Sequence, residues 1–201
     1  MILGSSGLGK SCSLRNFEPN EVGIFNVAGK PLPFRKKMNK IINNATYQTI
    51  QKSLNKPTLK KYVIDDSQFL MAFEMFDKAN INNYSKFTEI AVNFRNLIDQ
   101  VRKLPDDVIV YFLHHTEISD TGVLKAKTVG KMLDQQLTVE GMFSIVLLAK
   151  IDAGQYKFIT NSDGMTPAKS PMELFPLEIE NDLKFVDDAI RDYYGFAEKK
   201  D

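Results

Sequence analysis

A glycine-rich segment near the start of the chain has the residue types of a phosphate-binding loop. Residues 4–11 read Gly-Ser-Ser-Gly-Leu-Gly-Lys-Ser, which matches G-x-x-x-x-G-K-[ST] in full and follows an apolar run at 1–3. The glycines let backbone N–H groups point at a phosphate, the lysine reaches the β- and γ-phosphate oxygens, and the serine hydroxyl can ligate Mg²⁺. A helix opening at Lys10 would add the positive end of its dipole. We therefore expect ATP to be bound by Gly4, Ser5, Ser6, Gly7, Leu8, Gly9, Lys10, Ser11 and Cys12, with Lys10 catalytic and Ser11 on the metal.

Two adjacent acids form the second chemical signal. Asp65 and Asp66 follow the apolar residues 62–64. A strand beside the phosphate loop that ends in a carboxylate is the arrangement that holds Mg²⁺ in nucleotide hydrolases, so we predict that Asp65 binds the metal. Asp66 could polarise the attacking water, and its alternative role is to cap a helix that begins at Ser67.

Polar residues also follow the most apolar strand of the chain. Residues 108–113 are all apolar, and His114, His115, Thr116 and Glu117 come next. In open α/β sheets ligands bind outside the carboxyl ends of the strands, so a side chain there can reach the γ-phosphate or the attacking water. A hydrogen-bonded pair of strand-end histidines is the alternative. Zinc is disfavoured, because the chain has only two histidines and one cysteine.

The elements that must position these residues follow from apolar patterning. We expect helices at 37–54, 67–79, 86–103, 129–136 and 181–194, and strands at 22–27, 62–64, 108–113 and 143–149. A polar loop covers 116–128, and 155–160 with the turn 161–164 form one arm of a hairpin. Alternating strands and helices without a linker predict one α/β domain over 1–201, with a mainly parallel sheet flanked by helices and a C-terminal β-hairpin and helix. The first strand is either unusually short or has lost its natural N-terminus, and we favour the second reading.

Composition restricts the compartment and the partners. No apolar run approaches the ~20 residues that cross a bilayer, and no secretory signal is present, so we expect no membrane association. The single cysteine, Cys12, fits a reducing cytoplasmic location. The net charge is +1, but 35–61 holds basic residues without an acid, whereas 173–192 is mostly acidic. This asymmetry indicates a polyanion-binding face or an interface between copies of the chain, unless the basic stretch is simply a solvated helix.

The order of the later segments carries a resemblance to a known family. Residues 108–115, the polar loop, 128–133 and 143–148 resemble the second half of RecA-type ATPase cores. Over nearly its whole length the chain is similar to bacteriophage RecA-like ATPases encoded beside single-strand annealing and recombination genes. The matching pieces are residues 28–33, 128–133, 140–143, 168–171 and 181–183.

This resemblance implies a RecA-like P-loop NTPase core and a DNA-stimulated ATPase of phage-type recombination, located in the host cytoplasm. Its expected partners are single-stranded DNA, a single-strand annealing or binding protein, and further copies of the chain. His115 would sense the γ-phosphate, and Lys125 and Lys127 would lie on a DNA-facing loop at 116–128. Lys131 would reach the nucleotide of a neighbouring subunit, or else be an ordinary solvated lysine.

One departure from the family leaves the general base open. RecA carries a catalytic glutamate after its second strand, but here residues 26–29 contain no acid. Hydrolysis would therefore be slow or would use Asp66 or Glu117. A nucleotide-binding regulatory or scaffold protein with little turnover is one alternative. A small P-loop kinase is another, although none of the five arginines lies in 116–131, where a phosphate-clamping lid would be useful.

Overall fold

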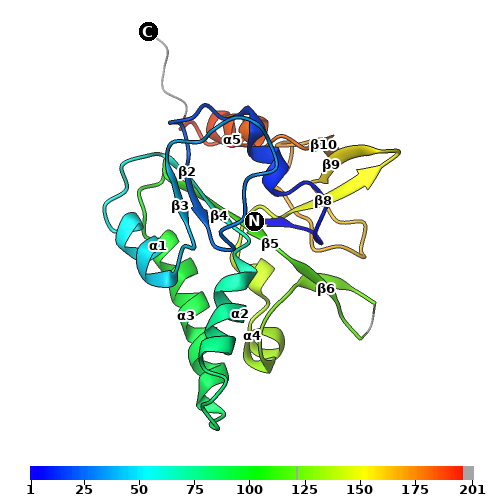
Figure 1. Cartoon of the computed structure of the whole chain (residues 1–201). Helices are drawn as coiled ribbons and strands as arrows, with labels where there is room; N and C mark the ends of the chain where they lie inside the picture. Colours follow the sequence, from blue (N-terminus) through cyan, green and yellow to red (C-terminus); the bar gives the residue numbers. More distant parts are fainter. Residues whose placement is uncertain (121, 197–201) are drawn as a thin grey trace.

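A mainly parallel sheet lies at the centre of the molecule (Figure 1). The computed structural model describes residues 1–120 and 122–196, without the side chains of residues 131, 134 and 135. In this part of the chain the sheet has eight strands in the order β10-β9-β8-β1-β5-β4-β2-β3. Their bounds are β1 Ile2–Leu3, β2 Gly23–Asn26, β3 Ile41–Asn43, β4 Lys61–Asp65, β5 Ile109–His114, β8 Leu147–Asp152, β9 Gln155–Ile159 and β10 Glu178–Glu180. The strands from β8 to β3 run parallel, and β9 and β10 are antiparallel to their neighbours.

Helices cover both faces of this sheet. They are η1 (Ser11–Asn16), α1 (Tyr47–Leu54), α2 (Gln68–Asp77), α3 (Ser85–Val101), α4 (Lys131–Gln136), η2 (Val139–Met142) and α5 (Leu183–Tyr193), where η marks a 3₁₀-helix. Figure 1 shows α1 to α4 on one side and α5 with η1 on the other. The expected α/β class, mainly parallel sheet, C-terminal hairpin and final helix are therefore confirmed.

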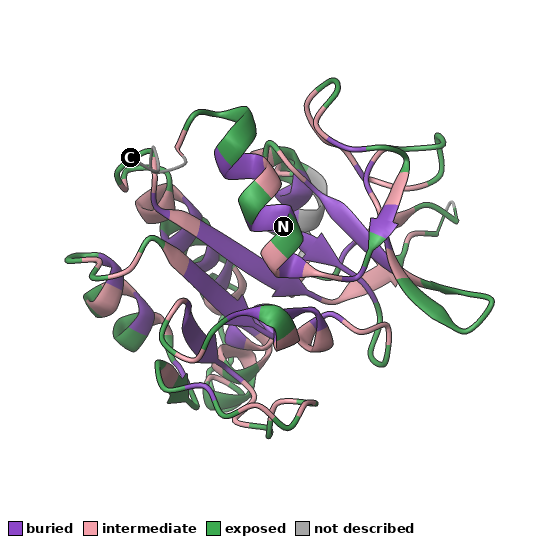
Figure 2. Ribbon diagram, turned by 90° about the horizontal axis from the view of Figure 1, so that it is seen from above, coloured by how far each residue is buried: buried purple, intermediate pink, exposed green. Residues whose placement is uncertain are grey.

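Alternation along the strands builds two separate hydrophobic layers. Ile24, Val63 and Leu113 pack with η1 and α5, whereas their neighbours Phe25 and Ile64 pack with α1, α2 and α3. Side chains on a strand point to opposite faces in turn, so a strand covered on both faces is apolar throughout. Figure 2 shows the result, with buried residues following the central strands and exposed residues on loops and outer helix faces.

The expected helix at 37–54 is wrong in its first half. Residues 41–43 form β3, which pairs in parallel with β2, and the helix α1 begins only at Tyr47. Two adjacent isoleucines favour a strand. Asn44 then adopts a positive φ of 53°, which is incompatible with a continuous right-handed helix through this position. Thr46 then caps the helix, accepting a hydrogen bond from the backbone N–H of Thr49.

The segment expected to be a polar loop at 116–128 contains a second, two-stranded sheet. Strand β6 (Thr116–Ile118) pairs antiparallel with β7 (Leu124–Ala126), and both leave the main sheet at the end of β5. Its short strands mix apolar with charged or polar residues, which weakens the sequence signal for pairing.

Two boundaries after residue 140 also differ from expectation. Strand β8 begins at Leu147, not 143, and extends to Asp152. The hairpin turn lies at Ala153 and Gly154, both with positive φ, and not at 161–164. Gly154 and Gly164 both adopt a positive φ, so a glycine suited to a turn does not by itself distinguish the two positions.

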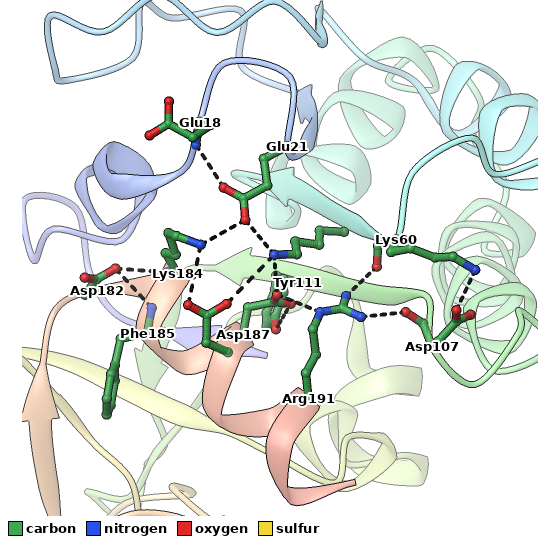
Figure 3. Close-up of polar contacts among 12 residues, drawn as sticks. Glu18, Glu21, Lys60, Asp107, Tyr111, Asp182, Lys184, Phe185, Asp187 and Arg191 are labelled. Atoms are coloured by element: carbon green, nitrogen blue, oxygen red, sulfur yellow. Dashed lines mark hydrogen bonds and ion pairs between the residues drawn. The ribbon is translucent and has the colours of Figure 1, made fainter. Parts of the chain in front are cut away.

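A polar network fastens α5 to the sheet on the side away from α1, α2 and α3 (Figure 3). The Asp187 carboxylate is fully buried and accepts hydrogen bonds from the Tyr111 hydroxyl and from Arg191 Nε, each at 2.8 Å. Lys61 Nζ lies 2.9 Å from Asp187 and 2.6 Å from Glu21. This network joins β4, β5 and α5 to the segment between η1 and β2.

Within the described residues, the structure contains no helix of the length and apolarity that crossing a bilayer requires.

Candidate functional site

The phosphate-loop segment leaves β1 at the carboxyl end of the sheet and curls around its own lysine. Gly7 and Gly9 adopt φ values of 86° and 84°, which glycine reaches without strain. Lys10 is buried, and its Nζ donates to the backbone oxygens of Gly4 at 2.6 Å and Ser5 at 3.0 Å. The expected helix after the loop is the six-residue 3₁₀-helix η1, so its dipole is smaller than a long α-helix would supply.

Burial also changes the acidity of Lys10. Desolvation lowers the pKa of its ammonium to about 8, although Asp66 and Asp65 nearby act in the opposite direction. An anionic ligand in the loop would favour the charged form and raise this pKa again. Lys10 is therefore a cation held in a poorly solvated position where a phosphate would compensate it.

Ser11 at the start of η1 and Asp65 at the end of β4 meet across the site, although β5 lies between β4 and β1 in the sheet. The Ser11 hydroxyl nevertheless donates to Asp65 Oδ1 at 2.8 Å. Two oxygens about 2.9 Å apart form an edge of a Mg²⁺ octahedron with bonds of about 2.0–2.1 Å, so this pair fits the expected metal.

The two acids have opposite electrostatic environments. Burial raises the pKa of Asp65 to about 6, partly offset by the hydrogen bond from Ser11. Burial would also raise the pKa of Asp66, but hydrogen bonds from His115 and Lys30 lower it to about 2. Asp65 would gain from a metal ion beside it, whereas Asp66 is already fully compensated.

Asp66 organises the far end of the site. Its Oδ2 lies 2.7 Å from Lys30 Nζ, and its Oδ1 accepts a hydrogen bond from His115 Nε2 at 3.1 Å. The residue has a positive φ of 59°, an uncommon conformation for aspartate that directs its carboxylate into the site. Ser67 occupies the cap position of α2, so the Asp66 side chain does not take the capping role weighed against catalysis.

The two histidines at the end of β5 have different surroundings. His114 is fully buried, and its Nε2 lies 2.8 Å from the backbone oxygen of Lys127, which can only accept, so Nε2 carries the proton. Burial lowers the pKa of His114 to about 4, which keeps the ring neutral at pH 7. His115 instead donates a hydrogen bond to the Asp66 carboxylate in the site, and its ring makes a T-shaped contact with the Phe69 ring.

The remaining predicted residues lie on or after the β6–β7 hairpin. Glu117 is ion-paired with Lys125 at 3.4 Å and is not part of the lining of the pocket described in the next paragraph. Lys127 is exposed. The hairpin touches the phosphate loop through the Ser5 and Thr116 hydroxyls, which are 3.2 Å apart. Lys131 begins α4, but its side chain lies outside the described residues.

A pocket of about 330 Å³ brings together the phosphate loop, Asp66 and His115. Its walls come from the phosphate loop, from the turn after β2, from the ends of β4 and β5, and from β9; the lining residues are Ser6, Gly7, Gly9, Lys10, Ser11, Cys12, Lys30, Pro33, Asp66, His115 and Tyr156. Sequence reasoning missed Lys30, Pro33 and Tyr156 as site residues. The signal for Lys30 was its position after β2, at the same sheet edge as Asp65 and His115. Tyr156 is distant in sequence and gave no signal.

Known proteins give no further identification. A comparison with protein-family models finds no match, and a comparison with curated proteins finds none of significance.

Proposed function

We propose that the chain binds ATP with Mg²⁺ in the pocket around Lys10 and hydrolyses it slowly as a RecA-like P-loop ATPase. The observation that carries this proposal is the contact between Ser11 and Asp65, two expected metal ligands separated by 54 residues, at 2.8 Å. It occurs beside a buried lysine inside a loop with the full phosphate-binding pattern.

Different residues of the site would bind different parts of the triphosphate. Backbone N–H groups of residues 7–11 would hold the β-phosphate, while Lys10 leaves the oxygens of Gly4 and Ser5 for phosphate oxygens. Ser11 and Asp65 would hold Mg²⁺, which neutralises negative charge on the phosphates. Lys30 and His115 also line the pocket, and Lys30 Nζ could donate a hydrogen bond to a terminal phosphate. His115 could do so through Nε2 only by exchanging its hydrogen bond to Asp66.

Slow turnover follows from the state of Asp66. A general base works best when its pKa is near the working pH, and Lys30 and His115 hold the pKa of Asp66 near 2. Asp66 can orient a water molecule or its two partners, but it is a weak proton acceptor. The same observation supports the second candidate, a nucleotide-binding regulatory or scaffold protein with little turnover.

Single-stranded DNA is proposed to act through the β6–β7 hairpin. The hairpin carries Lys125 and Lys127. Where it joins the main sheet, the Thr116 hydroxyl lies beside the Ser5 hydroxyl, and the backbone oxygen of Lys127 accepts a hydrogen bond from His114. DNA bound on the hairpin could therefore change the position of the loop and of β5. Action in phage-type recombination, a cytoplasmic location, self-association and a single-strand annealing or binding partner complete the proposal.

Calorimetric titration of the protein with ATP and Mg²⁺ tests the site. Lys10→Ala removes the central cation, so we expect ATP binding to fall by at least roughly 100-fold, as for loss of a charged contact with a buried phosphate. Lys86→Ala, a half-buried lysine on α3 that does not line the pocket, is the matched control and should bind like the parent. Equal ATP affinity in the Lys10 variant and the parent would reject the site assignment.

A steady-state assay then separates the two candidates. Phosphate release is measured with and without single-stranded DNA. Turnover that DNA increases supports the ATPase, whereas tight ATP binding without release of phosphate under either condition supports the regulatory protein.

A further inference from the structure

An exposed aromatic ring lies directly against the phosphate loop. Tyr156 on β9 is 48% exposed. A Cβ atom added to Gly9 would lie 2.7 Å from Tyr156 Cδ1, so the ring packs on the backbone of the loop at a point where only glycine leaves room. No role within the triphosphate site requires an aromatic side chain at this place.

Tyr156 also forms the wall between two pockets. One is the phosphate pocket, and the other is a neighbouring pocket of about 520 Å³. We call the second one the hairpin pocket; it is lined by Arg15, Gly154, Gln155, Tyr156, Lys157, Glu178, Ile179, Glu180 and Asn181. A ligand that extends from the phosphate loop past Gly9 in this direction must contact the Tyr156 ring.

Asn181 supplies an unused donor in the wall of the hairpin pocket. The residue is 1% exposed, and its backbone N–H donates to the backbone oxygen of Tyr156 at 3.3 Å. Arg15 donates to its backbone oxygen at 2.6 Å and to its side-chain Oδ1 at 3.5 Å, which leaves Nδ2 on the side of Gly9. Among the described residues this Nδ2 has no hydrogen-bond partner. A buried donor without a partner is costly, so its presence beside a ligand pocket needs an explanation.

The charges around the hairpin pocket are largely compensated inside the protein. Lys157 is paired with Glu178 at 3.2 Å, and Arg15 is occupied by the oxygens of Asn181 and Cys12. A further phosphate group would meet acidic residues here. A flat, uncharged ring with hydrogen-bond acceptors at its edge is the better match.

We infer that the hairpin pocket receives the heterocyclic base of the bound nucleotide, which stacks on Tyr156 and accepts a hydrogen bond from Asn181 Nδ2. This inference rests on the proposed function, because it places the base relative to a triphosphate in the adjacent loop. The stacking face accepts any base, so the contact would make a nucleoside triphosphate bind more tightly than a bare polyphosphate.

A comparison of ATP with inorganic tripolyphosphate tests the inference. Both ligands are titrated calorimetrically, with Mg²⁺, into the parent protein and into Tyr156→Ala. The parent should bind ATP at least about tenfold more tightly than tripolyphosphate. Loss of a base–aromatic stack should weaken ATP binding of the Tyr156→Ala variant roughly tenfold and leave tripolyphosphate binding unchanged within about twofold.

Three further variants serve as controls. Tyr156→Phe keeps the ring and should bind ATP like the parent, and Tyr156→Leu keeps apolar cover over Gly9 without an aromatic face. Tyr193→Ala removes a tyrosine of similar exposure on α5, outside both pockets, and should change neither affinity.

The possible outcomes distinguish this inference from the proposed function. If the parent binds neither ligand, both ideas fail. If the parent binds ATP but the Ala and Leu variants weaken ATP and tripolyphosphate equally, or weaken neither, the base lies elsewhere and only this inference is overturned.

Discussion

Folding and metal binding make opposite demands on the Asp65 carboxylate, because burial disfavours its charge and a metal site requires it. It is 5% exposed at the end of a buried strand, and the only side chain that donates a hydrogen bond to it among the described residues is Ser11. Burial raises its pKa to about 6, which means that keeping it ionised at neutral pH costs free energy in the absence of a cation. A metal bound with the nucleotide would remove this cost.

We therefore predict that Asp65→Asn stabilises the protein without Mg²⁺. Between the ordinary pKa of 3.8 and the raised value of about 6, the folded parent binds more protons than the unfolded chain, so its free energy of unfolding falls as the pH rises. The neutral amide of the variant would avoid this loss and can still accept the hydrogen bond from Ser11. Above pH 6 the variant should be more stable by on the order of 1–3 kcal/mol.

Urea unfolding of both proteins between pH 4 and pH 8, with a chelator present, measures this difference. Asp106→Asn, an exposed aspartate, provides the control and should follow the parent at every pH. Parallel stability profiles for Asp65→Asn and the parent would mean that Asp65 carries no burial cost.

How much of the site could be read from the sequence depended on where each residue lies in the chain. Lys10 and Ser11 belong to one contiguous pattern, and Asp65 and His115 follow apolar strands whose ends must share one edge of a parallel sheet. Lys30 also follows a strand, β2, that ends at this edge, but nothing in its own residue type marked it as part of the site, and Tyr156 has no such pattern. Tyr156 reaches Gly9 only because β9 folds back on β8, and a contact made by tertiary pairing leaves no periodic signal.

At the scale of single elements, the β6–β7 hairpin connects the exterior to the site. Its two strands continue directly from β5 and return to the backbone of His115, which accepts a hydrogen bond from the Lys127 N–H at 2.9 Å. Ile118 and Val123 on this hairpin are exposed, as are its lysines in part. The element thus offers both cations and apolar surface to a ligand outside the sheet.

The joint substitution Lys125→Gln and Lys127→Gln tests the hairpin as a DNA contact. Each phosphate contact contributes a slope of about −0.7 in log K against log salt for single strands, so losing two should flatten the slope by roughly one to two units. Fluorescence anisotropy with a labelled single-stranded oligonucleotide, repeated over a salt series, gives the slope.

A pair of basic residues elsewhere provides the matched control. Arg102→Gln with Lys103→Gln removes the same charge from the exposed end of α3 and should leave the slope unchanged. If both double variants flatten the slope equally, the effect comes from net charge, and the hairpin is not the DNA contact.

Element boundaries were predictable where the apolar pattern was long and failed where it was short. Helix α3 and strand β5 lie within two residues of their expected ends, because each buries a continuous stripe or run. Strand β3 was hidden inside an expected helix, since three residues cannot reveal a period of two. The β8–β9 turn was misplaced because Ser-Asp-Gly at 162–164 is as typical of a turn as Ala-Gly at 153–154.

At the scale of the whole molecule, the two ends of the sheet have separate tasks. The carboxyl ends of β1, β4 and β5 carry the candidate site, whereas Lys61, at the amino end of β4, belongs to the network around Asp187. Figure 3 shows Tyr111 and Arg191 converging on the Asp187 carboxylate. Arg191 also donates to the backbone oxygens of Lys60 and Asp107, which closes the connection between α5 and the start of the sheet.

We predict that Asp187→Ala destabilises the protein strongly while leaving the candidate site able to bind ATP. The substitution removes the buried carboxylate that Arg191 and Lys61 share, and although Lys61 keeps its ion pair with Glu21, Arg191 loses its carboxylate partner. Breaking a buried ion pair in this way typically costs about 3–5 kcal/mol. Asp188→Ala, at a largely exposed position on the same helix, should cost less than about 1 kcal/mol.

Thermal and urea unfolding measure both effects, and ATP titration at a temperature where Asp187→Ala is folded should give the parent's affinity. A stability loss shared equally by the two variants would show that Asp187 is not the anchor of α5, and a selective loss of ATP affinity would show that the two ends of the sheet are coupled.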